Sequence, residues 1–182
     1  FRLISLTWNF EHCFGFPNSR DRAVMERGLK PFGKDAVVRM QELGMLVDVS
    51  HISDAAFYDV LDCSSKPVVA THSCCRALAD HPRNMTDDMI RALADAGGDI
   101  QINFYQLFID DDFAKVLNES GIEERHEGVE AQFIACPSDP QKRAAWNAVQ
   151  DELMALPRPS YKRVVDHIDH AVSIAGIDHV GI

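Results

Sequence analysis

The sequence predicts an α/β fold, specifically part of a (β/α)8 barrel of the TIM-barrel type. Short β-like runs alternate along the chain with segments that carry helix signals, which is the pattern of parallel βα units. Two of these runs end in histidine. The chain has 182 residues, whereas a complete barrel of this kind takes about 250. We therefore expect some strands of the barrel to be missing.

Five runs are expected to form strands. Each is rich in apolar residues, four of them lead into a helical pattern, and the fifth closes the chain. Their order predicts a parallel sheet with helical crossovers. The runs are residues 3–7, 45–49, 67–71, 99–104 and 178–182.

Capping residues mark the helices between these strands. Ser53 and Thr86 can each cap a helix start, because the side-chain oxygen accepts a hydrogen bond from a free backbone N–H. Gly44 and Gly176 follow helical patterns and are suited to C-terminal caps. The expected helices are residues 33–43, 54–61, 87–96 and 161–175.

Residues 108–159 break this alternation. The stretch is long, carries consecutive acids at positions 110–112, and contains one expected helix at 140–156. Loops that follow barrel strands often carry lids and specificity elements. We therefore interpret residues 1–182 as one partial barrel domain with a loop insertion at 108–159.

The composition excludes several classes of function. The net charge of −10 and the pI of about 5.1 disfavour a nucleic-acid partner, because phosphate binding needs clustered Lys and Arg. No apolar run approaches the roughly 18 to 20 residues of a transmembrane helix. The five cysteines lack the spacing of a disulfide framework or a paired zinc site, so we expect buried or partly buried thiols.

His51 and His72 each end a β-like run, one βα unit apart. The C-terminal ends of neighbouring parallel strands converge on one mouth of a barrel, so both imidazoles are expected there. A hydrolytic zinc site needs nitrogen or oxygen ligands and an open position for water. Either histidine alone would more simply be a hydrogen-bonded strand-end residue, but two at equivalent positions favour a shared metal ion. Asp48 is either a partner of such a ligand or a buried acid.

Six segments, in order, resemble successive motifs of the renal (membrane) dipeptidase family of zinc dipeptidases. They cover nearly the whole chain outside the insertion. The resemblance implies the C-terminal portion of a two-zinc dipeptidase barrel, approximately its strands four to eight. The segments are Leu6-Thr7-Trp8-Asn9, Gly28-Leu29-Lys30-Pro31-Phe32-Gly33, residues 43–51, Thr71-His72-Ser73, Asp80-His81-Pro82-Arg83-Asn84 and Asn103-Phe104-Tyr105.

The resemblance also implies roles for individual residues. His51 and His72 match the two histidines that ligate the second zinc ion, on the fifth and sixth strands. Arg83 matches the arginine that binds the terminal carboxylate of the substrate, a contact that suits a planar guanidinium. Without the resemblance, a surface ion pair would be the simpler interpretation of Arg83.

Trp8 departs from the family pattern. Many members have histidine at this place on the fourth strand, where it polarises the scissile carbonyl or stabilises its oxyanion. Tryptophan cannot make that imidazole contact, although its indole N–H is a donor and Asn9 is adjacent. We expect Trp8 and Asn9 to bind substrate, and the departure leaves substrate range and rate open.

The remaining histidines are weaker metal candidates. His81 is expected to shape the loop that carries Arg83. His167 and His170 can share one face of the last expected helix, where packing or capping is the expected role.

Three elements of the family have no counterpart in this sequence. They are the His-x-Asp of the first strand, the bridging glutamate of the third, and the proton-transfer aspartate of the eighth, whose motif should begin at Gly181-Ile182. The catalytic residue is therefore unknown here. We expect the full-length enzyme to hydrolyse dipeptides with a water activated by two zinc ions, and this fragment alone to be inactive.

Two other functions stay open. One is a non-catalytic barrel remnant that binds a peptide or protein partner through the same mouth. The other is a metal-dependent amidohydrolase acting on lactones or cyclic amides, which is disfavoured because no lysine ends a β-like run. A small dipeptide is the expected partner, and the sequence decides neither homodimer formation nor compartment.

Overall fold

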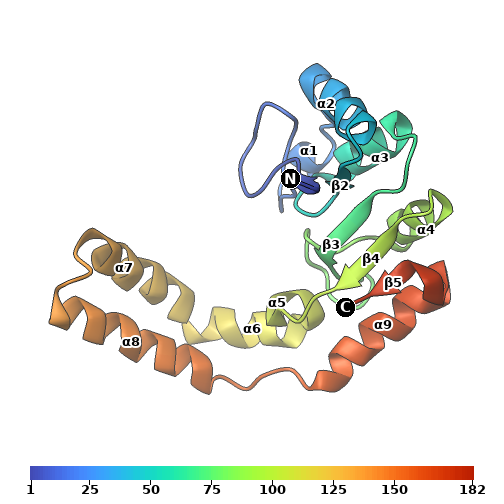
Figure 1. Cartoon of the computed structure of the whole chain (residues 1–182). Coiled ribbons are helices and arrows are strands. Elements are labelled where there is room, and N and C mark those ends of the chain that lie inside the picture. Colours follow the sequence, from blue (N-terminus) through green and yellow to red (C-terminus); the bar gives the residue numbers. More distant parts are fainter.

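Five parallel strands form one sheet in the computed structural model, which describes residues 1–182 (Figure 1). The strands lie side by side in chain order, and all four pairings are parallel. The predicted α/β fold with a parallel sheet is therefore confirmed. The strands are β1 (Leu3–Ser5), β2 (Leu46–Asp48), β3 (Val69–Ser73), β4 (Asp99–Ile102) and β5 (Val180–Gly181).

The helices that connect these strands follow the predicted punctuation. The Ser53 and Thr86 side chains accept hydrogen bonds from backbone N–H groups in the first turns of their helices, as N-caps do. Gly44 has a φ of 73° directly after a helix, a conformation that glycine adopts without a Cβ penalty. The helices are α1 (Arg22–Met25), α2 (Pro31–Glu42), α3 (Asp54–Cys63), α4 (Asp87–Asp95) and α9 (Tyr161–Ala175), and a 3-10 turn covers Ile177–His179.

The core lies between the sheet and the helices that cover it. Val47 and Ile100 on the strands and Phe57 on α3 are completely buried, and Leu93 on α4 is almost completely buried. Burial of large apolar side chains is the main stabilising contribution to such a layer. The core therefore fixes the strand ends that carry the candidate site.

Residues 108–159 contain more helix than the sequence predicted. The expected helix at 140–156 is present, but three further helices precede it, so the expectation of a single helix was wrong. Helix α7 buries only Ile122, which leaves a weak apolar period for sequence analysis. The helices are α5 (Gln106–Ile109), α6 (Asp111–Ser120), α7 (Ile122–Ala135) and α8 (Pro140–Ala155).

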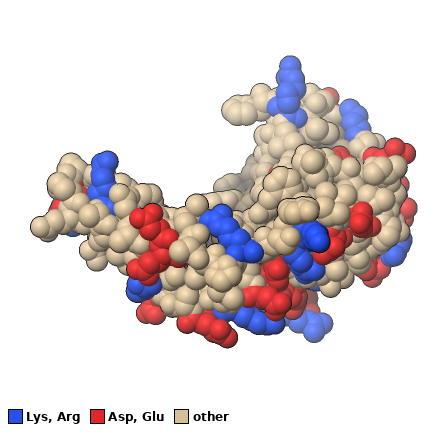
Figure 2. Space-filling view, turned by 90° about the horizontal axis from the view of Figure 1, so that it is seen from below, with Lys and Arg blue, Asp and Glu red and all other residues tan.

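We call α6 to α8, residues 111–155, the arm. Figure 1 shows α7 and α8 side by side, standing out from the sheet and its helices. Within the arm, Phe133 stacks on Trp146 with ring centroids 5.0 Å apart, and Arg125 pairs with Glu152. Figure 2 shows that acidic and basic side chains are interspersed on the face seen from below. No helix of the protein is long and apolar enough to cross a membrane.

His167 joins three parts of the fold. The side chain is completely buried on α9. Its Nδ1 accepts a hydrogen bond from the Cys75 backbone N–H at 3.1 Å, and its Nε2 lies 3.2 Å from the Ile109 carbonyl oxygen. Because Nδ1 accepts, the proton is on Nε2, which donates to that carbonyl. His167 thus has the packing role expected from the sequence.

We predict that His167→Ala lowers the free energy of unfolding of the full-length protein by roughly 2 to 5 kcal/mol, because it leaves two buried backbone groups without partners. Urea unfolding monitored by circular dichroism measures the change. His170→Ala is the matched control, since His170 contacts the partly exposed Asp87 and should cost less than about 1 kcal/mol. Equal losses for the two variants would contradict the role of His167.

Candidate metal and substrate site

His51 and His72 face each other at the C-terminal end of the sheet. Their Nε2 atoms are 2.8 Å apart and their ring centroids 4.8 Å apart. His72 is the fourth residue of β3, whereas His51 lies in the turn after β2, three residues beyond its end. The side-by-side placement predicted from the sequence is therefore present, although only His72 belongs to a strand.

The backbone of His51 is in the left-handed region, with a φ of 68°. It is the only residue other than glycine with a positive φ in this chain. Such a conformation is uncommon for a residue with a Cβ and concentrates at functional sites, where the surrounding structure holds it in place. The Thr7 hydroxyl contributes to this restraint by donating a hydrogen bond of 2.8 Å to the His51 carbonyl oxygen.

The imidazole pair has the chemistry of a zinc site but not a complete one. Two nitrogens bound to one tetrahedral zinc at about 2.0–2.1 Å lie roughly 3.3 Å apart, so the rings need to separate by only about half an ångström. The Nδ1 atom of His51 is buried without a hydrogen-bond partner. No group of three or more His, Cys, Asp or Glu side chains in the chain is arranged to hold a metal ion. The pair therefore fits as two ligands of a larger shell.

Asp48 lies beneath this pair and is almost completely buried. Its carboxylate accepts hydrogen bonds from the Ser5 hydroxyl, the Ser50 N–H, and both the N–H and the hydroxyl of Thr71. Burial opposes ionisation, but these donors outweigh it and hold the pKa of the Asp48 carboxyl below its ordinary value. The acid is therefore a buried, hydrogen-bonded carboxylate.

Arg83 is buried beside the histidines, with 7% of its surface exposed. One guanidinium nitrogen, Nη2, donates to the His72 carbonyl oxygen at 3.1 Å, while Nε is buried without a partner. The guanidinium carbon lies 5.2 Å from the centre of the Phe108 ring. No carboxylate pairs with Arg83, so the surface ion pair considered from the sequence is excluded. Burial lowers the pKa of Arg83 to about 10, which still leaves it charged at neutral pH.

The environment keeps both imidazoles neutral. Burial and then the positive charge of Arg83 lower the pKa of His51 to about 4, and the same two causes lower the pKa of His72. Metal binding requires neutral imidazole, so this site needs no proton release at neutral pH.

Trp8 and Asn9 follow β1 but line different cavities. The Trp8 ring, 64% exposed, lies 6.3 Å from the His51 ring. A cavity of about 410 Å³ contains Trp8, His12 and the two paired histidines. Asn9 instead lines a larger cavity of about 690 Å³ against the arm. The structure thus brings Trp8 to the imidazole pair and does not bring Asn9 there.

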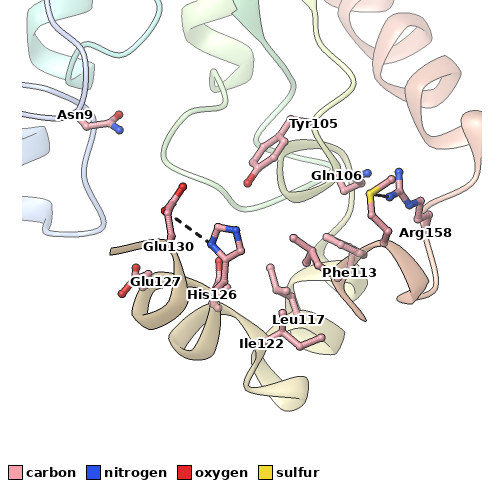
Figure 3. A pocket seen from close by; sticks show the side chains of 13 residues that line it. Asn9, Tyr105, Gln106, Phe113, Leu117, Ile122, His126, Glu127, Glu130 and Arg158 are labelled. Carbon is pink, nitrogen blue, oxygen red and sulfur yellow. Dashed lines mark hydrogen bonds and ion pairs between the residues drawn. The ribbon is translucent and has the colours of Figure 1, made fainter. Parts of the chain in front are cut away.

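The larger cavity lies between the strand ends and the arm (Figure 3). Tyr105, just after β4, points into it, and Glu127 and Glu130 border it from α7. Glu123 belongs to the same lining, and a spacing of four and then three residues places all three acids on one helical face. This acidic face was not predicted from the sequence, although the spacing of its residues was a signal for it.

Two other expectations concern the loop after β3. His81 Nδ1 accepts the Arg83 N–H at 3.1 Å, and its ring lies 4.6 Å from Phe108, so His81 shapes the Arg83 loop as predicted. Cys74 and Cys75 are buried and unpaired, and burial raises the pKa of each thiol to about 12. These cysteines are therefore protonated packing residues. Cys13 and Cys136 are exposed, so the expectation of buried or partly buried thiols was wrong for these two.

A model of the membrane dipeptidase family, peptidase family M19, matches residues 1–182. The chain belongs to this family. An uncharacterized dipeptidase of Schizosaccharomyces pombe is 33% identical over 182 residues, which cover 100% of this chain and 34% of that protein. Dipeptidase tcpJ of Claviceps purpurea is 33% identical over 165 residues, covering 91% of this chain and 29% of that protein. The chain thus spans about a third of the length of these curated relatives.

Solved structures of other proteins share the fold. The probable dipeptidase PvdM from Pseudomonas aeruginosa matches with a TM-score of 0.72 and 28% identity, over 100% of this chain and 50% of that one. A metallo peptidase from Rhodobacter sphaeroides, liganded with a phosphinate mimic of the dipeptide L-Ala-D-Ala, matches with a TM-score of 0.67 and 23% identity over 100% of this chain and 41% of that one. The second likeness establishes fold alone. Membrane dipeptidases are hydrolases and metallopeptidases, and their TIM-barrel-like fold is matched here in part.

We predict that His81 makes the protein less stable as the pH is lowered. Burial and then the charges of Arg20 and Arg83 lower the pKa of folded His81 to about 4, whereas an unfolded histidine titrates near about 6.5. Between these values the unfolded chain binds more protons, so the free energy of unfolding decreases as pH falls through this window.

His81→Asn retains an acceptor for the Arg83 N–H and removes the titrating ring. Urea unfolding of the full-length protein at several pH values from about 7 to 4.5 should show a shallower loss of stability for the variant. Parallel curves for wild type and variant would show that His81 does not contribute.

Proposed function

We propose that the full-length protein is a zinc-dependent dipeptidase that hydrolyses the peptide bond of a dipeptide with a water activated by two zinc ions. The observation that carries the proposal is the pair of imidazoles, with Nε2 atoms 2.8 Å apart, beside a buried guanidinium that has no carboxylate partner. Membership of a dipeptidase family supports the substrate class. The dipeptide mimic bound by the Rhodobacter sphaeroides relative is consistent with it.

Under this proposal His51 and His72 hold one zinc ion through their Nε2 atoms. Zinc supplies a water of lowered pKa and polarises the scissile carbonyl. The two rings are neutral and already close together, so little rearrangement precedes binding. The remaining ligands and the proton-transfer aspartate come from other parts of the enzyme, and we propose that this chain alone is inactive.

Arg83 is proposed to bind the free carboxylate of the dipeptide. A buried guanidinium with an unpartnered Nε–H is a strong donor toward a carboxylate in a low-dielectric site. Its loop is fixed on both sides, because the Ser73 hydroxyl donates to the Arg83 carbonyl and His81 accepts the Arg83 N–H. The charge is therefore held in place before substrate arrives.

Trp8 and Asn9 are proposed to contact different parts of the substrate. Trp8 lies beside His51 and can border the scissile bond, with its indole N–H as a donor. Asn9 belongs to the cavity shared with the arm. We propose one partial barrel domain over residues 1–182, in which the insertion at 108–159 forms the outer wall of that cavity.

The zinc assignment is tested in the full-length enzyme with His51→Ala and His72→Ala. Each variant should lose bound zinc, because each removes a ligand of the same ion. Elemental analysis after gel filtration measures the metal content per protein. His12→Ala is the control, since this exposed ring lines the same cavity outside the pair. Unchanged zinc in both test variants would refute the assignment.

The role of Arg83 is tested with Arg83→Leu and with substrates that lack a carboxylate. Arg83→Leu should lower kcat/KM for free dipeptides, because a hydrogen bond to a charged group is lost. The corresponding loss of transition-state stabilisation is about 1.5 to 3 kcal/mol. The wild type should discriminate against C-terminally amidated dipeptides, and the variant should not. Arg83→Lys should recover part of the preference, because it restores the charge without the planar fork. Equal wild-type activity on the acid and the amide would overturn the role.

A further inference from the structure

The Asp48 carboxylate accepts four hydrogen bonds from three neighbouring strand segments. The donors are the Ser5 hydroxyl at the end of β1, the Ser50 N–H after β2, and the N–H and hydroxyl of Thr71 in β3. No cation pairs with Asp48. A carboxylate surrounded only by donors acts as an acceptor at every contact. The direction of each proton in this group is therefore determined.

Thr71 connects this carboxylate to His72. Its Oγ1 lies 2.8 Å from an oxygen of Asp48 and 2.8 Å from Nδ1 of His72. A hydroxyl has one proton to donate, and here it is donated to the carboxylate. Oγ1 can only accept from His72, so the His72 ring carries its proton on Nδ1. The lone pair is then on Nε2, the atom that faces His51.

His51 has no equivalent support. Its Nδ1 is buried without a partner, so only the contact with His72 selects between its two neutral forms. At 2.8 Å from the Nε2 lone pair of His72, His51 donates from Nε2 in the arrangement seen here. The two rings of the pair are therefore chemically unequal, and only His72 is held in its ligand form.

We propose that Asp48 and Thr71 are positioning residues that hold His72 in the Nδ1–H form, with its Nε2 lone pair directed at the metal position. This inference rests on the proposed function, because it takes His72 as a zinc ligand. Histidine ligands commonly donate their second N–H directly to a carboxylate or a carbonyl. Here the Thr71 hydroxyl lies between the carboxylate and the ring. It donates its proton to Asp48 and therefore accepts the Nδ1–H of His72.

The arrangement also predicts how Asp48→Asn acts. An asparagine NH2 turned toward Thr71 donates where the carboxylate accepted, and the Thr71 hydroxyl is then free to donate to Nδ1 of His72. The ring proton would move to Nε2, which is the wrong atom for metal binding. Thr71→Val removes the hydroxyl and with it the preference of His72 for the Nδ1–H form, whereas Thr71→Ser keeps both.

Zinc affinity of the full-length enzyme tests the proposal, measured by competition with a chromogenic chelator. Thr71→Val and Asp48→Asn should weaken zinc binding about 10- to 100-fold, the range known for partners of histidine ligands. Thr71→Ser should bind zinc like the wild type. Thermal unfolding of each metal-free variant shows whether it is folded.

A second readout serves if Thr71→Val or Asp48→Asn fails to fold. In metal-free protein labelled with ¹⁵N-histidine, the His72 ring should show a protonated Nδ1 in the wild type and in Thr71→Ser, with the signal assigned by its loss in His72→Ala. A protonated Nε2 in the wild type would overturn the inference, as would wild-type zinc affinity in a folded Thr71→Val. If instead His72→Ala keeps its full zinc content, the proposed function itself fails.

Discussion

The ionised, buried carboxylate of Asp48 is the constraint on which the site depends. It links β1, β2 and β3 by accepting hydrogen bonds from Ser5, Ser50 and Thr71. A buried carboxylate without hydrogen-bond partners is strongly unfavourable. Loss of any of these hydrogen bonds would therefore destabilise the fold. Ser50 and Thr71 directly precede the two histidines in the chain, so these hydrogen bonds contribute to the placement of both rings.

The positive charge of Arg83 is the second constraint. It stands close enough to lower the pKa of both imidazoles, and it is attached to His72 through the backbone carbonyl of that residue. Arg83 and His72 thus belong to one hydrogen-bonded group formed by β3 and the loop after it. A neutral imidazole pair favours a metal ion, and an uncompensated guanidinium favours an anion. The arrangement suits a ligand with a carboxylate at one end and a polarisable carbonyl near the other.

Much of this could be predicted from the sequence. The strand order, the caps at Ser53 and Thr86, and the approach of His51 to His72 follow from local patterns and from the geometry of parallel strands. Helix α7 of the arm could not be predicted, because it buries only Ile122 and carries almost no apolar period. The left-handed backbone of His51 was also not predictable, since it is imposed by contacts that are distant in sequence, such as the Thr7 hydroxyl.

Diffraction from crystals of the full-length enzyme at the zinc absorption edge tests the central claim most directly. We predict an anomalous peak about 2.0–2.1 Å from Nε2 of both His51 and His72, with Nδ1 of His72 still in contact with Thr71. A zinc position that excludes either histidine, or one bound through Nδ1 of His72, would contradict it.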